Sequence, residues 1–314
     1  MLATPAEPAG STFKDRLTHP AYPTHEVGGM VFAYLGPREK MPLFPNYEWT
    51  NVPSDHCYVV KSLLECNYLQ GLEGECDSSH LSFLHRNLAA GEHVLYKADT
   101  SPSYETEDAD FGVRLVALRH LDENKTYVRV SSFLMPLSCV VPVRGAEDGY
   151  DVHFYTPLDD THAWRFDFTF KRSRAIAPGD RERDGFIDEQ YHKRQNKGNH
   201  YRIDREKQRR ENFTGLGPIF PVHDGMATET QGSRYDRSAE HLGTSDKGVI
   251  SVRRFMLDAI KAYQRGEEPP HVVTDPSRND FRHLDSLTGV IDGDDWRATY
   301  PHLRCAPGEA ALVR

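Results

Sequence analysis

Almost perfect alternation of apolar and polar side chains over residues 162–171 limits the fold of this chain more than any other feature. The segment reads His-Ala-Trp-Arg-Phe-Asp-Phe-Thr-Phe-Lys. Because successive side chains of a β-strand point to opposite faces, the pattern predicts a strand in a sheet with one face against a core. Further strand-like segments precede it at residues 58–65, 93–99, 112–119, 126–134 and 150–156.

Two other segments have helical periodicity. The first runs from residue 67 to about residue 85, and the second is an amphipathic helix at residues 246–265 that ends before Gly266. Gly71 and Gly74 weaken the first helix, which indicates that something packs close to its backbone. The order of elements predicts an α+β domain of the helix-grip (START/Bet v1-like) type, in which a curved antiparallel sheet wraps the long C-terminal helix. Such a fold tends to enclose a cavity suited to a small apolar ligand.

Composition changes along the chain divide it into three parts. Residues 1–50 are rich in proline and glycine and read as a linker, with one plausible buried strand at residues 30–35. Residues 51–270 contain the periodic segments and form the main domain, apart from a charged, helix-compatible excursion at residues 178–212 that we expect to be solvated. Residues 271–314 are polar and low in periodicity, and we interpret them as a C-terminal tail.

The overall composition excludes several classes of protein. The net charge of −9 argues against nucleic acid as the main partner, and no run of about 18 apolar residues predicts a membrane span. The first residues have no basic or apolar region typical of a signal peptide. The five cysteines are odd in number and form no C-x-x-C pair. They therefore predict free thiols in a reducing cytoplasm, without a structural zinc or a cysteine-ligated cluster within this chain.

Asp77, His80 and His85 form the motif D-x-x-H-x-x-x-x-H. Two histidines and one carboxylate with open positions are the typical ligands of non-haem iron(II). On a straight helix the two rings would lie about 7.5 Å apart along the axis and about 140° apart around it, so the helix must bend or end near Phe83 and Leu84. The chain has 16 histidines and 47 acidic residues. Spacing alone therefore leaves surface or structural histidines as an alternative, and it does not identify the third ligand.

Several segments resemble the Rieske non-haem iron oxygenase α-subunits, most closely the phthalate 4,5-dioxygenase-like branch. The likeness covers about residues 5 to 270. It is strongest in the iron-site helix at residues 67–85 and in the stretch DRSAEHLGTSD at residues 236–246. Weaker matching blocks lie at residues 7–11, 20–24, 212–215 and 223–224.

The resemblance implies that His80, His85 and Asp224 are the ligands of a mononuclear Fe2+. It also implies that Asp77 links an iron-bound histidine to a cluster-ligating histidine of the neighbouring subunit, which agrees with the carboxylate partners that metal-bound histidines commonly have. Asn67 matches a family asparagine near the iron that is usually not a ligand. The match around Asp224 is looser, because His223 replaces the more usual glutamine. The alternative is that His223 or Glu229 lies nearer the metal.

By the same resemblance, the chain is the catalytic part of an aromatic-ring oxygenase. It would activate O2 to hydroxylate or oxidatively demethylate a small, carboxylated aromatic substrate, with an NAD(P)H-dependent reductase as partner and a homotrimer as the assembly. Family members carry a [2Fe–2S] cluster on a C-x-H…C-x-x-H motif, and this sequence contains neither half of that motif. We therefore expect that this chain does not bind the cluster, that residues 1–50 are a remnant following a Rieske domain, and that the chain alone has little or no turnover.

Two other functions are compatible with the residues. A metal-free carrier of hydrophobic ligands could use the same cavity without chemistry. A zinc hydrolase would need a general base such as Glu73 or Glu75, although H-E-x-x-H is absent. A carboxylated substrate would require a cation in the cavity. Arg172 and Arg253 lie near predicted core elements, but we expect both to be surface cations.

Overall fold

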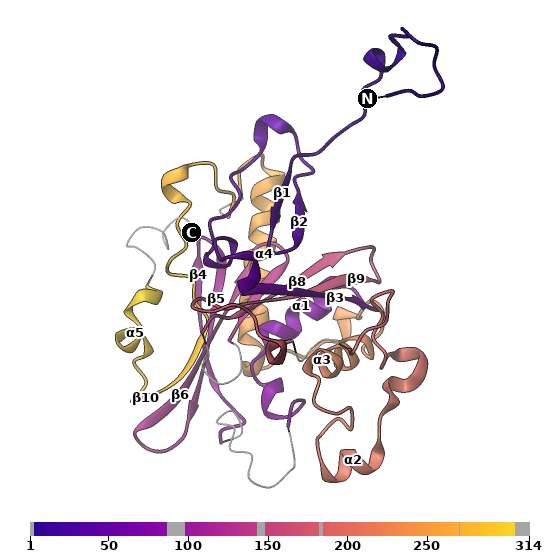
Figure 1. The fold of residues 1–314 in the computed structure, drawn as a ribbon. Helices are drawn as coiled ribbons and strands as arrows, with labels where there is room; N and C mark the ends of the chain where they lie inside the picture. Colours follow the sequence, from indigo (N-terminus) through magenta and orange to yellow (C-terminus); the bar gives the residue numbers. More distant parts are fainter. Residues whose placement is uncertain (1–2, 87–97, 143–147, 182–184, 270, 305–314) are drawn as a thin grey trace.

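The computed structural model describes residues 3–86, 98–142, 148–181, 185–269 and 271–304. Within these residues an antiparallel sheet of eight strands forms the centre of the molecule, in the order β3-β9-β8-β7-β6-β5-β4, with β10 paired to β6 (Figure 1). Its strands are β3 (Cys57–Leu64), β4 (Ser103–Ala109), β5 (Gly112–His120), β6 (Lys125–Leu134), β7 (Ser138–Val141), β8 (Asp151–Pro157), β9 (Ala163–Phe170) and β10 (Leu287–Asp292).

The strand β6 is where the sheet divides. Residues 126–134 pair with β5 on one edge, while β7 pairs with residues 132–134 and β10 pairs with residues 125–130 on the other. The two short strands therefore share one edge of β6. The segment 271–314, which we interpreted as a tail, thus contributes a strand to the sheet, and Ile291, Trp296 and Leu303 are buried against β5 and β6.

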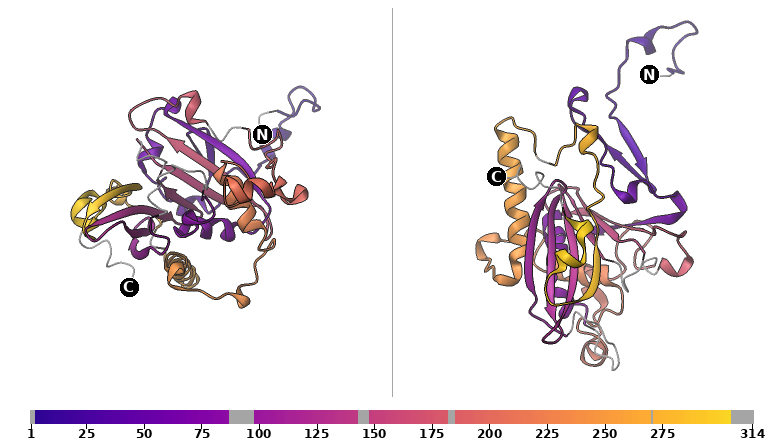
Figure 2. Two further views of the ribbon diagram at one scale, coloured as in Figure 1. Left: turned by 90° about the horizontal axis from the view of Figure 1, so that it is seen from below. Right: turned by 90° about the vertical axis from the view of Figure 1, so that its left-hand side faces the viewer.

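Three helices cover one face of the sheet: α1 (Tyr68–Cys76), α3 (Phe220–Glu229) and α4 (Lys247–Gln264). Helix α1 contacts β6, β7 and β8, whereas α4 contacts β4, β5 and α1, so α1 lies between much of the sheet and α4 (Figure 2). The fold is therefore α+β as predicted. However, the helix that packs on the centre of the sheet is α1, whereas α4 packs on strands β4 and β5. Two short helices, α2 (Arg205–Arg210) and α5 (Trp296–Thr299), lie outside this layer.

The N-terminal segment covers the other face of β8 and β9. Tyr47 and Trp49 are buried in a cluster with Phe168 and Phe170, so the end of the predicted linker is part of the core. Strands β1 (Thr24–Val27) and β2 (Met30–Ala33) pair only with each other. The predicted buried strand at residues 30–35 is thus shorter than expected and buried only at Met30. The residues before β1 extend away from the body of the molecule (Figures 1 and 2).

The other sequence predictions have mixed outcomes. The strands at residues 58–65, 112–119, 126–134, 150–156 and 162–171 and the helix at residues 246–265 are confirmed. The helix predicted to reach residue 85 ends at Cys76 instead. Most of the predicted strand at residues 93–99 lies outside the described residues. The excursion at residues 178–212 is mostly irregular, and Phe186 and Tyr201 are buried, so it is not wholly solvated.

No described helix combines the length and the apolar character that a membrane span requires.

Candidate metal centre

The end of α1 places the first half of the site. Asn67 caps the start of the helix, where its Oδ1 accepts a hydrogen bond from the N–H of Leu69. The helix ends at Cys76, and Asp77 is extended. Its carboxylate then accepts hydrogen bonds from the N–H groups of Ser79 at 2.6 Å and His80 at 3.0 Å. These bonds compete with continuation of the helix, so the chain turns at Asp77 and continues as a short 3-10 helix, His80–Ser82.

Because the 3-10 helix ends at Ser82, His80 and His85 do not lie on one straight helix, and their imidazoles approach each other. The ring centroids of His80 and His85 are 5.0 Å apart. His80 donates a hydrogen bond from Nδ1 to the backbone carbonyl of Asp77 at 2.5 Å, which leaves the Nε2 lone pair available to a metal. His85 is buried, and its ring stacks on Phe220 with centroids 4.0 Å apart. The α-helix ends at Cys76, and the 3-10 helix that bears His80 ends at Ser82 with a non-helical Phe83, so the break between the two histidines lies next to Phe83, as predicted.

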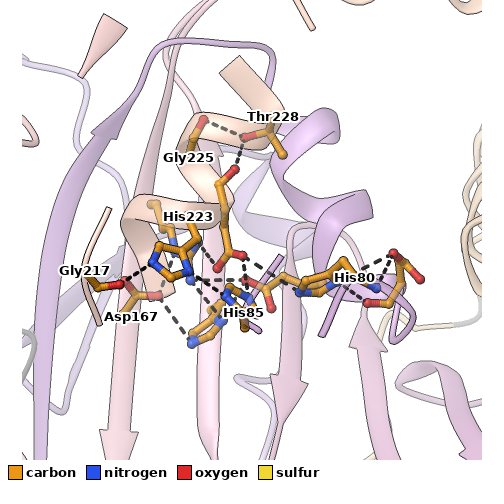
Figure 3. A network of polar contacts seen from close by, with 12 residues as sticks. His80, His85, Asp167, Gly217, His223, Gly225 and Thr228 are labelled. Carbon is orange, nitrogen blue, oxygen red and sulfur yellow. Dashed lines mark hydrogen bonds and ion pairs between the residues drawn. The ribbon is translucent and has the colours of Figure 1, made fainter. Parts of the chain in front are cut away.

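Helix α3 delivers the carboxylate. Asp224 Oδ1 lies 2.9 Å from His85 Nε2 and 3.9 Å from His80 Nε2. One ligand atom from each of the three side chains can be chosen so that all three lie within 4.8 Å of one another. Figure 3 shows His80 and His85 approaching each other beside the helix that bears His223. Three residues from two segments about 140 positions apart thus converge on one point.

The electrostatics of the three side chains suit a cation. Burial alone would raise the pKa of Asp224, but His85 and Arg165 lower it well below the ordinary value, so the group is a carboxylate. Burial lowers the pKa of His85, which favours the neutral imidazole that a metal requires. At His80, the hydrogen bond to Asp77 and the nearby Asp224 charge outweigh burial and raise the pKa. A cation at this point would meet one negative charge and two oriented imidazoles.

Beneath Asp224 lies a buried charge network that the sequence analysis did not predict. The Asp224 Oδ2 atom is 3.5 Å from Arg165 Nη1 on β9. Arg165 also contacts Asp167 at 2.8 Å and Glu75 at 3.2 Å. His153 on β8 contacts the same two carboxylates. Burial and the His153 and Arg165 charges act in opposite directions on Glu75, and the charges hold its pKa well below the ordinary value.

This network corrects the interpretation of residues 162–171. The alternation predicted one face against a core, with the polar face left for solvent. Instead, Arg165 and Asp167 are buried toward α1 and α3, while Phe168 and Phe170 pack against the N-terminal segment. Both faces of β9 are therefore covered. The register of the two strands places His153 opposite Asp167, and alternation within a single strand does not show this pairing.

Other candidate residues lie in different surroundings. Asn67 donates from Nδ2 to the carbonyl of Asp160 and caps the opposite end of α1 from Asp77, about 15 Å away by helical rise. The structure thus brings Asp77 to His80, but it does not bring Asn67 to the three ligand candidates. Glu229 accepts hydrogen bonds from Lys193 and from the Tyr201 hydroxyl, away from the site.

The residues required by the alternative functions have structural partners. Glu73 pairs with Arg237 and Arg253, and Glu75 belongs to the Arg165 network, so both predicted hydrolase bases are engaged in salt bridges. Arg253 also pairs with Glu240. Arg172 pairs with Glu48 and Asp285. None of these contacts joins Arg172 or Arg253 to the residues of the metal centre.

The donor set fits iron(II). Two neutral nitrogen donors and one carboxylate match the preference of this ion, and none of the described cysteines, Cys57, Cys66, Cys76 and Cys139, belongs to the group. Ligands of a metal with bonds of about 2.1 Å cannot be more than about 4.2 Å apart. The two distances from Asp224, 2.9 and 3.9 Å, already meet this limit, so only the coordinating nitrogens of His80 and His85 would have to approach each other, by at most about 0.6 Å.

Comparison with known proteins identifies the family of the chain. The model of the family described as LigXa C-terminal domain like matches residues 33–307. The chain is 34% identical over 318 residues to the phthalate 4,5-dioxygenase oxygenase subunit of Pseudomonas putida, covering 93% of this chain and 70% of that protein. It is 29% identical over 316 residues to the 3-chlorobenzoate-3,4-dioxygenase oxygenase subunit of Comamonas testosteroni, covering 92% and 72% respectively.

Among solved structures, the terminal oxygenase of carbazole 1,9a-dioxygenase from Nocardioides aromaticivorans IC177 aligns with a TM-score of 0.46 and 16% identity, over 83% of this chain and 72% of that one. The family assignment rests on the sequence matches, which extend over most of the chain and include all three ligand candidates. The chain therefore belongs to the LigXa C-terminal-domain-like family, and it is an oxidoreductase of the Rieske non-haem iron oxygenase α-subunits in the phthalate 4,5-dioxygenase-like branch.

Proposed function

We propose that this chain is the catalytic part of an aromatic-ring oxygenase and that His80, His85 and Asp224 hold a mononuclear iron(II). The observation that carries the proposal is the convergence of these three side chains within 4.8 Å. Iron(II), when bound there, would supply the activation of O2 that oxygen chemistry on an aromatic ring requires.

The protein's own groups would hold and orient that ion. Asp77 fixes the ring of His80 through its backbone carbonyl, and Arg165 holds the second oxygen of Asp224. A carboxylate held from behind by a buried arginine does not have to reorganise when it coordinates a metal. The stacking of Phe220 on His85 covers one side of that imidazole and excludes water from it.

The substrate that we propose is a small aromatic carboxylate. Support comes from relatives whose names specify phthalate, 3-chlorobenzoate and phenoxybenzoate. A further relative is a 5,5'-dehydrodivanillate O-demethylase subunit, so the reaction could be hydroxylation or oxidative demethylation.

We also propose an electron-donating partner, a homotrimeric assembly and a cytoplasmic location. Solved relatives include complexes of an oxygenase with its ferredoxin. Asp77 is suited to the proposed contact with a neighbouring subunit, because its side chain is 26% exposed while its carboxylate is oriented by two backbone N–H groups. The four described cysteines are free thiols, which agrees with a reducing compartment.

Metal analysis tests the proposed centre directly. Purified protein loaded anaerobically with Fe(II) and then desalted should contain one iron per chain, whereas His80→Ala and Asp224→Ala should contain almost none. His120→Ala is the matched control, because that histidine is 54% exposed and lies at the end of β5. Wild-type protein without stoichiometric iron would support the metal-free carrier instead, and iron retained by both site variants would show that these residues do not hold the metal.

Oxygen consumption tests the electron route. These 314 residues contain no C-x-H or C-x-x-H motif. We therefore expect the iron-loaded chain, supplied with benzoate-type substrate and a reductase alone, to consume little O2. Addition of a [2Fe–2S] protein of the Rieske class should restore substrate-dependent uptake. Robust coupled turnover without the cluster protein would show that electrons reach the site by another route.

A further inference from the structure

We infer that His223 is a positioning residue for His85: its Nδ1 accepts a hydrogen bond from the Nδ1–H of His85 and so orients Nε2 of His85 toward the proposed metal position beside Asp224. This inference rests on the proposed metal centre. It gives a role to the histidine that precedes Asp224, which the sequence analysis considered only as an alternative ligand.

The first step is the position of His223. Helix α3 begins at Phe220, so His223 and Asp224 lie in its first two turns, and His223 is 2% exposed. The Nδ1 atoms of His223 and His85 are 3.1 Å apart. His223 therefore approaches the side of the His85 ring that faces away from Asp224, whose Oδ1 is 2.9 Å from His85 Nε2.

The second step fixes the proton on His223. Its Nε2 lies 2.7 Å from the backbone carbonyl of Gly217, which can only accept a hydrogen bond (Figure 3). Nε2 must therefore be the protonated nitrogen, and the Nδ1 of a neutral His223 carries a lone pair. Gly217 has a φ of +89°, a conformation that suits glycine, and thus presents its carbonyl from a turn just before α3.

The third step identifies which nitrogen of His85 donates the hydrogen bond. Two neutral imidazoles 3.1 Å apart through Nδ1 form a hydrogen bond only if one is protonated there and the other is not. Because Gly217 takes the His223 proton on Nε2, His85 must be the Nδ1–H donor. When a metal lies between Nε2 and Asp224, Nε2 carries no proton and its lone pair can coordinate the metal.

Helix α3 would therefore supply the ligand Asp224, and through His223 it would also orient the ligand His85. Metal-bound histidines usually donate their remaining N–H to a carboxylate, a carbonyl or water, and loss of such a partner costs about 10- to 100-fold in metal affinity. Here the partner is an imidazole, which is itself oriented by the Gly217 carbonyl. A change at residue 223 should therefore alter the metal without removing any ligand.

Two nearly isosteric variants test the inference. His223→Asn places an oxygen acceptor where Nδ1 lies, and His223→Leu places a methyl group there. Fe(II) affinity should fall about 10- to 100-fold in His223→Leu and stay within about threefold of wild type in His223→Asn. The ligand-field spectrum of the Co(II)-substituted protein should shift in the leucine variant and be largely restored in the asparagine variant. Met226→Leu, a change of similar volume on α3, is the control.

A second measurement detects directly which ring nitrogens of His85 and His223 carry protons. In the Zn(II)-loaded protein labelled with 15N-histidine, long-range 1H–15N spectra should show His85 protonated at Nδ1 and His223 protonated at Nε2. This measurement uses the wild-type sequence, so it decides the question even if His223→Leu does not fold. A proton on Nδ1 of His223, or equal Fe(II) affinity in wild type and folded His223→Leu, would overturn the inference alone. Absence of Fe(II) binding by wild type would instead overturn the metal centre itself, and this inference with it.

Discussion

At the scale of single residues, Arg165 carries most of the charge balance beneath the metal centre. It is buried and contacts Glu75, Asp167 and Asp224. Removal of the cation from a buried ion network leaves carboxylates without compensation, which costs about 3–5 kcal/mol. We therefore expect Arg165→Met to lower the free energy of unfolding by this amount, measured by urea denaturation of the metal-free protein.

The control for this prediction is an exposed arginine. Arg209 pairs with Glu206 on α2, and both side chains are more than 60% exposed. Arg209→Met should leave the free energy of unfolding nearly unchanged, because exposed ion pairs contribute little. Similar unfolding midpoints for wild type and Arg165→Met would mean that the buried carboxylates are satisfied without this arginine.

His271 should make the stability of the protein depend on pH. Burial lowers its pKa from 6.5 to about 4, and its Nδ1 has no hydrogen-bond partner among the described residues. Below pH 6.5 the unfolded chain therefore binds a proton that the folded chain excludes. The stability that depends on neutral His271 is complete above pH 6.5 and is lost as the pH falls toward 4.

Comparison with a non-titrating side chain measures this contribution. Between pH 7.5 and pH 5, wild type should lose about 1–2 kcal/mol more of its free energy of unfolding than His271→Gln does. Urea denaturation at both pH values gives the two differences. A loss of the same size in the variant would assign the pH dependence to other groups.

The residues of the site differ in how far the sequence could predict them. The spacing of His80 and His85 was visible, but the choice of Asp224 among 47 acidic residues came from the family resemblance. Tertiary packing brings α3 to α1, and no local pattern encodes that contact. Arg165 and Asp167 were visible as polar positions of a strand, yet alternation cannot show whether a polar face meets water or a buried network.

At the scale of elements, two glycines of α1 should respond oppositely to the same substitution. A Cβ atom at Gly71 would lie 2.5 Å from Tyr155 Cε1 and 2.7 Å from Leu64 Cδ2, whereas one at Gly74 would meet only Thr228 Cγ2 at an ordinary 3.7 Å. Gly71→Ala should therefore destabilise the protein by about 1–3 kcal/mol through overpacking. Gly74→Ala should stabilise it by about 0.5–1 kcal/mol through helix propensity.

Urea denaturation of both variants checks this pair, and each serves as the control for the other. Stabilisation by both substitutions would show that α1 can move away from β8 at little cost. The expectation that something packs close to the α1 backbone is confirmed at Gly71 by its contact with Tyr155 and Leu64, whereas Gly74 is not crowded.

The elements that escaped prediction have weak local signals for physical reasons. Strand β4 reads Ser-Tyr-Glu-Thr-Glu-Asp-Ala, with alternating side chains that are mostly polar. Its glutamates pair with arginines, such as Glu105 and Glu107 with Arg297. Strand β10 contains a glycine and buries only Ile291 well. Both strands exist because β5 and β6 offer them hydrogen-bonding edges, which is information outside their own sequences.

At the scale of the whole molecule, the two terminal segments pack against different parts of the central sheet. Trp49 lies in the apolar cluster that covers β8 and β9, and Trp296 lies in the cluster on β5 and β6. The third tryptophan, Trp164, is on β9 itself, where the Lys61 ammonium lies 3.8 Å from its ring centroid. Each tryptophan thus reports on one part of the chain that the sequence analysis treated as a separate region.

This distribution predicts that the segment around Trp49, the central domain and the segment around Trp296 unfold together. Burial of Trp49 and Trp296 against the same sheet couples both terminal segments to the central core, so no part should melt independently. In three variants that each keep one tryptophan and replace the other two with phenylalanine, the urea transition seen by fluorescence should coincide with that seen by far-UV circular dichroism. A fluorescence transition at lower urea in the Trp49 or Trp296 variant would instead show that the corresponding segment is an independently unfolding attachment.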